Sequence, residues 1–294
     1  MKVPTIIDNL VHQKTISQSV LGIFFTPGSS HAGSLSFGKP EQDKILGDVT
    51  YVPITTTTPS ANYWGFEQSV NYNGKQILKK TAGTTDTGGY LEFFGRLRII
   101  DLRCIVIGTT LTLLASDAYN AYKNETGAVL DSNTGLLSIT PAQFSKLKNL
   151  DFNIGGKTFT LNANAQIWPR SLNSAINGEK NKIYLIVSDV GSDSGSGLDF
   201  VMGFTWLYVY SLQHGSKLED SPTASYYSQR FYTVYDSGKK QIGFAKTSVS
   251  FHPSYFSSPS QKIYLYLEVH RCYHQLMGPL SLLCLLLYLG HESV

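Results

Sequence analysis

The sequence is poor in charged residues and in cysteine. Only 15% of its 294 residues are charged, and the formal net charge is +3. So small a positive charge, with no basic stripe along the chain, argues against a nucleic-acid partner. The three cysteines, Cys104, Cys272 and Cys284, lack the spacing of metal ligands, and an odd number does not suit a disulfide framework. We therefore expect no metal, no cofactor and no nucleic acid.

Long hydrophobic runs are also scarce. The C-terminal segment LMGPLSLLCLLLYLG contains an apolar run of about fourteen residues, interrupted by Pro279, whereas crossing a bilayer takes about twenty. A membrane partner is therefore not expected, and we prefer a non-native tail to the alternative of a membrane anchor. The N-terminal MKVPTIIDNLVHQ lacks the apolar core of a signal peptide, so nothing in this chain directs secretion.

Gly, Ser, Thr, Asn and Tyr are plentiful, which favours short strands joined by turns. We expect SVLGIFFTP and AGSLSFGKP to pair, and RFYTVYDSGKKQIGFA to form a final hairpin. Asn73-Gly74 and Gly155-Gly156 are predicted hairpin turns. The pattern therefore predicts a mostly β domain.

Two short helices are expected within this β pattern. The first lies in TIIDNLVHQKTI, where apolar residues share one helical face. The second lies in ASDAYNAYKNETGA, where Ser116 or Asp117 could cap the start and Gly127 could end the helix.

Three segments differ in composition from the rest of the chain. Residues 89–108 are apolar and basic, and residues 208–228 separate two segments that would otherwise join as one strand. The third segment is the tail, residues 255–294. All three cysteines and most of the arginines lie within these segments. We interpret all three as foreign to the domain.

An Asp-Thr-Gly tripeptide at 86–88 is the best catalytic motif in the chain. Such a tripeptide alone is weak evidence, because turns use the same residues. Asp193-Ser194-Gly195 lies in a polar Gly/Ser loop and Asp236-Ser237-Gly238 at a hairpin tip, so we interpret both as turns. Asp86 differs because, without residues 89–108, the text reads AGTTDTG-TTLTLLASDAY: strand, turn, strand and helix.

The segments around this motif resemble the C-terminal lobe of pepsin-like aspartic endopeptidases, closest to the polyporopepsin type of basidiomycetes. The resembling text covers most of residues 2–88, 109–207 and 229–249, and includes GSLSFG, YWGFEQS, TAGTTDTG, TTLTLLASDAYNAYKNETGAV, LDFNIGGKTFTLNANAQIWP and SDVGSDSGSGLDFVMGFTWL. This resemblance implies antiparallel sheets that pack orthogonally, a few short helices and a missing N-terminal lobe.

The resemblance also implies a domain organisation. Residues 1–254 would be one lobe, interrupted by 89–108 and 208–228, and residues 255–294 a non-native tail. Removing either internal segment restores a family segment without leaving a gap. We therefore interpret the three segments as translated non-coding sequence, which splice signals at their edges would support. Genuine lineage insertions are the alternative.

By resemblance, the chain is an aspartic endopeptidase lobe that acts on extended peptides. Asp86 would be the second of two carboxylates that share a proton and activate a water. Thr87 would bond to the opposite lobe, and Gly88 would permit the tight loop. The family places Thr or Ser after this glycine to orient the carboxylate. Here Gly89 follows instead, and Thr109 takes that place only if residues 89–108 are absent.

Two further expectations follow from the family pattern. The family usually has two bulky apolar residues before the catalytic Asp, whereas Thr84-Thr85 stand here. No second Asp-Thr-Gly in a comparable strand setting occurs, so the chain should be inactive alone and need an N-terminal lobe or a second subunit. Family members are secreted, which the resemblance implies for the complete protein.

Other classes of function remain open from the residues. A homodimer with one Asp-Thr-Gly per chain, as in retroviral-type proteases, would supply both carboxylates, and an inactive lobe could still bind peptides. A hydroxyl- or thiol-nucleophile hydrolase is disfavoured, because the seven histidines are scattered and no G-x-S-x-G elbow occurs. Asn124-Glu125-Thr126 is a sequon, which makes Asn124 a glycosylation candidate.

Overall fold

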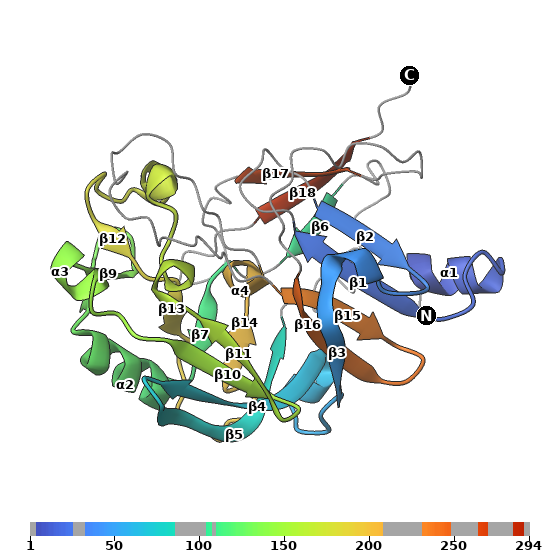
Figure 1. Ribbon diagram of the computed structural model, residues 1–294, viewed down its shortest axis with the longest axis horizontal. Coiled ribbons are helices and arrows are strands. Elements are labelled where there is room, and N and C mark those ends of the chain that lie inside the picture. Colours follow the sequence, from blue (N-terminus) through green and yellow to red (C-terminus); the bar gives the residue numbers. More distant parts are fainter. Residues whose placement is uncertain are drawn as a thin grey trace.

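The computed structural model describes residues 4–25, 33–85, 104–107, 110–207, 231–247, 264–269 and 285–290. Two large sheets dominate this part of the chain (Figure 1). Helices are few and short, so the prediction of a mostly β domain is confirmed.

The five-stranded sheet joins the first strands of the chain to a hairpin near residue 240. Its order is β2-β1-β15-β16-β3. Every neighbouring pair is antiparallel, including the expected pairing of β1 with β2 and the hairpin β15–β16. Its strands are β1 (Val20–Phe25), β2 (Gly33–Phe37), β3 (Ile45–Pro53), β15 (Phe231–Asp236) and β16 (Gln241–Thr247).

The seven-stranded sheet has the order β11-β10-β4-β5-β14-β7-β13. Its first four strands pair antiparallel, whereas β14 pairs parallel with β5 and β13 pairs parallel with β7. Its strands are β4 (Trp64–Tyr72), β5 (Lys75–Thr85), β7 (Thr112–Leu114), β10 (Leu150–Ile154), β11 (Lys157–Leu161), β13 (Val187–Asp189) and β14 (Phe200–Met202). The strand that comes last in sequence, β14, thus lies between β5 and β7.

Both predicted two-residue turns are present. Asn73 and Gly74 join β4 to β5 with φ angles of 51° and 77°. Gly155 and Gly156 join β10 to β11 with φ angles of 56° and 79°. Two successive residues with positive φ give the turn whose twist matches that of a hairpin, which explains why glycine occurs at both turns.

The two predicted helices are α1 (Ile6–His12) and α2 (Ser116–Thr126). Gly127 ends α2 in the left-handed conformation, as expected. The prediction that Ser116 or Asp117 caps its start is wrong, because Ala115 occupies the N-cap and makes no side-chain bond. The Ser116 hydroxyl donates instead to Asp189 Oδ1 at 2.7 Å, and Asp117 accepts from Ser194 at 2.6 Å.

Two further α-helices are each four residues long: α3 (Pro141–Phe144) and α4 (Phe204–Leu207). The helix α4 corrects the expectation that the segments on either side of residues 208–228 would join as one strand. GFTWL ends in a helix, and β15 begins only at Phe231. The described residues also form four short 3-10 helices: Gln42–Lys44, Ser60–Asn62, Ala163–Gln166 and Arg170–Ile176.

Two small sheets accompany the large ones. One has the order β12-β9-β8, from β8 (Val129–Leu130), β9 (Leu137–Ile139) and β12 (Ile183–Tyr184). The other has the order β17-β18-β6, from β6 (Cys104–Ile107), β17 (Tyr264–Val269) and β18 (Leu285–Gly290). All three strands of this last sheet come from residues 89–108 and the tail, and they pair only with one another among the described strands.

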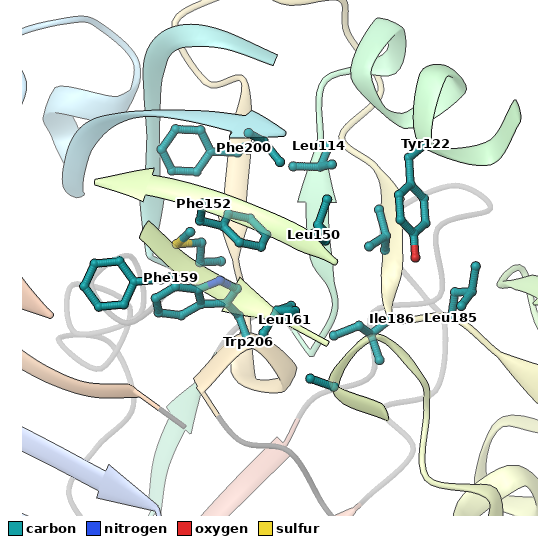
Figure 2. Close-up of a cluster of buried hydrophobic side chains, with 14 of the residues drawn as sticks. Leu114, Tyr122, Leu150, Phe152, Phe159, Leu161, Leu185, Ile186, Phe200 and Trp206 are labelled. Carbon is teal, nitrogen blue, oxygen red and sulfur yellow. The ribbon is translucent and has the colours of Figure 1, made fainter. Parts of the chain in front are cut away.

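The hydrophobic core lies between the large sheets and beneath α2. Trp206 of α4 lies beside Phe152 and Phe159, while Leu114 and Leu150 continue the core toward Tyr122 (Figure 2). Trp206 and Trp168 are buried and Trp64 is partly buried, as expected for core or cleft-wall positions. Within the described ranges, no helix is long and apolar enough to span a bilayer.

Candidate active site

The residues that the sequence assigns to catalysis lie outside the described part of the chain. Asp86, Thr87, Gly88 and Thr109 all belong to this group. The structure describes what stands immediately before and after them, namely β5 up to Thr85 and the chain from Thr110 onward. The site is therefore built from its supporting residues.

The strands that lead to and from the motif flank a single strand. Met202 of β14 pairs with Thr85 of β5 on one side and with Thr112 of β7 on the other. Because neighbouring strands lie about 4.8 Å apart, Thr85 and Thr112 are about 10 Å from one another. Thr85 and Thr112, which stand before and after the motif in the described chain, thus both lie on inner strands of the seven-stranded sheet.

Two threonines end the strand that precedes Asp86. Thr85 is fully buried, faces Trp64 across the β4–β5 pair, and lies 3.5 Å from the Tyr235 hydroxyl through its Oγ1. The Tyr235 ring meets that of Trp64 edge to face, with centroids 5.2 Å apart. The Thr84 hydroxyl donates to the Thr85 carbonyl at 3.0 Å. Polar contacts from both large sheets therefore surround a position that is usually apolar in the resembling family.

The strand that follows the motif is held by α4. The backbone N–H of Thr205 and its hydroxyl both donate to the Thr110 carbonyl oxygen, at 2.9 and 2.7 Å. Both threonines are buried. The sequence analysis did not identify Thr205, and only its position beside the buried Trp206 in GFTWL could have indicated it.

The two Asp-Ser-Gly tripeptides form turns, as predicted. Asp236 ends β15, and its carboxylate accepts from the Lys239 N–H at 2.9 Å and the Gln241 amide at 3.0 Å. Gly195 has a φ of +101°, in an irregular loop where Asp193 is exposed. The Asp236 carboxylate is thus bonded within its own hairpin turn, and Asp193 lies in an exposed loop.

The loop that leads to β14 is held by a buried carboxylate that the sequence analysis missed. Asp199 is fully buried and accepts from the Thr81 hydroxyl, from the N–H groups of Gly195 and Ser196, and from the Ser196 hydroxyl. Its backbone N–H donates to the Ala82 carbonyl at 2.9 Å. Asp199 therefore fixes this loop to β5, four residues before Asp86.

A second carboxylate holds the other side of the same loop. Asp117 of α2 accepts from the Ser194 N–H at 3.1 Å as well as from the hydroxyl. Partial burial raises the pKa of Asp117, but these hydrogen bonds outweigh that effect and hold its pKa below the usual value.

Other residues that the sequence analysis considered are not among those that support the Asp-Thr-Gly motif. Asn124 is exposed near the end of α2, and the hydroxyl of Thr126 in its sequon donates to the Tyr122 carbonyl at 2.9 Å. His12 is exposed and ends α1. Among the described residues, no group of three or more His, Cys, Asp or Glu side chains is arranged to hold a metal ion.

Comparison with known proteins adds independent evidence. The family model for eukaryotic aspartyl proteases matches residues 1–178. Polyporopepsin of Irpex lacteus is 45% identical over 250 residues, which cover 84% of this chain and 62% of polyporopepsin. Cathepsin D of Dictyostelium discoideum is 25% identical over 245 residues, which cover 83% of this chain and 51% of that protein. The chain thus spans about half to three fifths of the length of these relatives.

A solved structure agrees with the sequence relatives. The crystal structure of the aspartic proteinase from Irpex lacteus matches with a TM-score of 0.67 and 45% identity, covering 84% of this chain and 62% of that one. The fold is therefore that of a pepsin-like protease, as the sequence predicts. Since the family model spans more than half of the residues, the chain belongs to the family of eukaryotic aspartyl proteases.

Proposed function

We propose that this chain is the C-terminal lobe of a pepsin-like aspartic endopeptidase and that Asp86 is one of its two catalytic carboxylates. One observation carries the proposal: Thr85, which precedes Asp86, and Thr112, which follows the motif, both pair with Met202. A loop that opens between central strands lies at the end of a rigid sheet, where a catalytic group can be held in place. The family membership of the chain supports the same assignment.

The proposed chemistry needs two carboxylates and a water. Two Asp side chains about 3 Å apart cannot both ionise, so one keeps a proton. The ionised group removes a proton from a water that attacks the scissile carbonyl, while the neutral acid polarises that carbonyl and a proton passes to the leaving amine. Asp86 supplies one carboxylate, Thr87 contacts the opposite lobe, and Gly88 permits the turn. Thr109 takes the place that orients the Asp86 carboxylate only if residues 89–108 are absent. The reaction uses no cofactor and no metal.

The second carboxylate has to come from another lobe. Because the chain spans 62% of polyporopepsin, we propose an N-terminal lobe as its partner and a peptide or protein in extended form as its substrate. Alone, the chain is inactive. We further propose that the complete enzyme is secreted and that Asn124, exposed on α2, carries a glycan.

Lobe recombination tests this function. The full chain is refolded with and without a separately produced N-terminal lobe of a pepsin-like enzyme, and hydrolysis of a fluorogenic peptide is followed at acidic pH. We expect hydrolysis only in the mixture, and a loss of at least about a thousandfold in kcat with Asp86→Asn, because a dyad with one carboxylate cannot activate water.

The matched control is Asp193→Asn, which changes an exposed aspartate of a similar tripeptide. This variant should keep full activity in the mixture. Hydrolysis that survives Asp86→Asn, or that requires Asp193, would refute the assignment.

A further inference from the structure

The chain contains two Asn-Gly dipeptides, at residues 73–74 and 177–178. In such a dipeptide the backbone nitrogen of the glycine can attack the side-chain amide carbon of the asparagine, because glycine has no side chain to hinder the approach. Asn73 and Asn177 are both exposed, and both have a left-handed backbone with φ angles of 51° and 54°. The two sites therefore share their chemistry and local conformation, and they differ in the surroundings of the glycine.

The peptide group between Asn73 and Gly74 has no partner that restrains it. Among the described residues, neither the Asn73 carbonyl nor the Gly74 N–H takes part in a hydrogen bond. A methyl group placed on the Gly74 Cα would find no atom within 4 Å. Rotation of this peptide group therefore breaks no hydrogen bond and meets no neighbouring side chain.

Rotation of the same peptide group brings the reacting atoms together. The φ angles of Asn73 and Gly74, 51° and 77°, are those of a type I′ turn. Rotating the peptide group between them gives a type II′ turn, which also fits a two-residue hairpin and reverses the sign of φ only at Gly74. The ψ angle of Asn73 is then about −120°, which places the Gly74 nitrogen beside the Asn73 amide carbon. The hairpin thus reaches the reactive arrangement without separating β4 from β5.

The second dipeptide is restrained by its surroundings. The Gly178 N–H donates to the Asn173 carbonyl at 2.8 Å, where the 3-10 helix Arg170–Ile176 ends. A methyl group on the Gly178 Cα would lie 2.6 Å from the ring of Tyr184, which is buried. Rotation of the peptide group between Asn177 and Gly178 would break this hydrogen bond beside a closely packed ring. The Gly178 nitrogen is therefore held away from the Asn177 amide carbon.

We infer that Asn73 is a site of spontaneous deamidation in the folded chain and that Asn177 is protected from it. A bond forms between the Gly74 nitrogen and Asn73 Cγ, the bond from Cγ to Nδ2 breaks, and ammonia leaves with the proton of the Gly74 N–H. Water then opens the resulting cyclic imide at either of its carbonyls, which gives aspartate or isoaspartate. Water is the only co-reactant, and nothing is oxidised or reduced. This inference is independent of the proposed function.

The isoaspartate product changes the hairpin, because its backbone runs through the former side chain and is longer by one methylene group. The two-residue turn pairs Tyr72 with Lys75, and a longer turn no longer fits this register. Lys75 also pairs with Glu125 of α2 at 2.9 Å, so the change reaches the contact between β5 and α2. The aspartate product keeps the normal backbone and tolerates the left-handed conformation.

The test follows both sites in one sample of the full chain. The folded chain is kept at mildly alkaline pH, where the attacking nitrogen loses its proton more readily, and peptide mapping by mass spectrometry measures conversion over time. We expect Asn73 to convert at least about fivefold faster than Asn177, the effect of one net hydrogen bond at Gly178. In urea, where the fold is lost, both sites should convert at similar rates. Equal rates in the folded chain, or a difference that persists in urea, would overturn the inference.

Amide hydrogen exchange tests the cause that the structure gives for this difference. In the folded chain the Gly74 amide should exchange nearly as fast as in an unfolded peptide, and the Gly178 amide at least about fivefold more slowly. A Gly74 amide as protected as that of Gly178 would contradict the inference.

A matched variant separates the added charge from the altered backbone. Asn73→Asp introduces the carboxylate on a normal backbone and should melt close to the unmodified chain. The isoaspartate form, isolated by ion exchange, should melt at a lower temperature. If the isoaspartate form melts together with Asn73→Asp, the proposed effect on the hairpin is wrong.

Discussion

Asp131 is a buried carboxylate that organises the turn between β8 and β9. It accepts from the Lys182 ammonium at 2.8 Å and from the N–H groups of Asn133 and Thr134 at 2.9 and 3.2 Å. The hydrogen bond from Lys182, with smaller contributions from the two N–H groups, lowers the pKa of Asp131 although burial opposes this. The charged form is therefore the one that stabilises the fold.

This lowered pKa predicts how stability depends on pH. An Asp whose pKa is lower in the folded chain stabilises the fold above its unfolded pKa of about 3.9, and that contribution is lost as pH falls through the folded pKa. Asp131→Asn should thus lower the free energy of unfolding by about 1–2 kcal/mol near pH 6. The difference from wild type should shrink below about pH 3. Urea unfolding at several pH values measures both quantities.

An exposed ion pair provides the control for Asp131. Glu67 pairs with Lys80 at 3.0 Å, and both side chains are largely in solvent. Glu67→Gln should change stability by less than about 0.5 kcal/mol at any pH, because exposed pairs contribute little. A loss in Asp131→Asn that persists undiminished at pH 2 would contradict the role of the charge.

At the scale of secondary-structure elements, the sequence correctly predicted the hairpin turns and the helix end that short-range interactions determine. Asn73-Gly74 and Gly155-Gly156 predicted their hairpins, because residues that accept positive φ fix this turn regardless of distant contacts. Gly127 predicted the end of α2 for the same reason. The alternation of apolar residues likewise predicted the strands on either side of these turns.

Long-range contacts explain what the sequence did not predict. The hydroxyl of Ser116 bonds to Asp189 and the carboxylate of Asp117 bonds to Ser194, each more than seventy residues away, so neither caps α2. GFTWL was expected to extend a strand, but burial of Trp206 among four aromatic rings favours a helical turn. No short-range pattern contains that information.

The candidate site shows the same contrast between what a short sequence motif predicts and what long-range contacts determine. The Asp-Thr-Gly motif singled out Asp86 from the sequence, and whether it is catalytic remains a prediction. The supporting contacts of Asp199 and Thr205 were not predicted, because their partners Thr81 and Thr110 are about a hundred residues distant in sequence. The insertion of β14 between β5 and β7 brings these partners together.

The positions of β5 and β7 on either side of β14 indicate whether the chain needs residues 89–108 to connect these two strands. With these residues removed, six residues would connect Thr85 to Thr112. A chain of that length reaches about 20 Å, and the gap between the two strands is only about 10 Å. We therefore propose that the lobe closes without residues 89–108.

A similar argument applies to residues 208–228. With this segment removed, Gln229 and Arg230 would join Leu207 to Phe231. The helix α4 already packs on β15, with the rings of Trp206 and Phe231 4.5 Å apart. Some Cα atoms of α4 and β15 lie within 8 Å of one another, and two residues with the bonds on either side reach about 10 Å. We propose that this segment is also dispensable to the fold.

These two proposals give a prediction for a shortened chain. A variant that lacks 89–108, 208–228 and 255–294 loses β6, β17 and β18, which pair only with one another among the described strands. The variant should unfold cooperatively, at a midpoint no lower than that of the full chain. Differential scanning calorimetry measures this midpoint.

The control for the shortened chain is removal of a hairpin of the large sheet. Deleting residues 150–161 takes away β10 and β11, with the buried Phe152 and Phe159. This deletion should abolish cooperative unfolding. If the shortened chain fails to unfold cooperatively under conditions where the full chain does so, the removed segments belong to the fold and the domain proposal is wrong.

At the scale of the whole molecule, strands from distant parts of the chain share one sheet. The strand β1 from the N-terminal region pairs with β15, more than two hundred residues later. Strands from both the N-terminal and the C-terminal parts of the described chain are needed to form this sheet, so these parts belong to one folding unit. We propose that the second carboxylate comes from another polypeptide or lobe.

Two sources of that carboxylate predict different behaviour in solution. If the chain is one lobe of a two-lobed enzyme, it should sediment as a monomer at micromolar concentration and fail to bind pepstatin, which needs both carboxylates. Addition of an N-terminal lobe should then create pepstatin binding that Asp86→Asn removes. If the chain instead works as a homodimer, it should sediment as a dimer and bind pepstatin by itself, with loss of binding in Asp86→Asn. Analytical ultracentrifugation and calorimetric titration of the same sample separate the two, and a dimer that binds pepstatin would replace the two-lobed proposal.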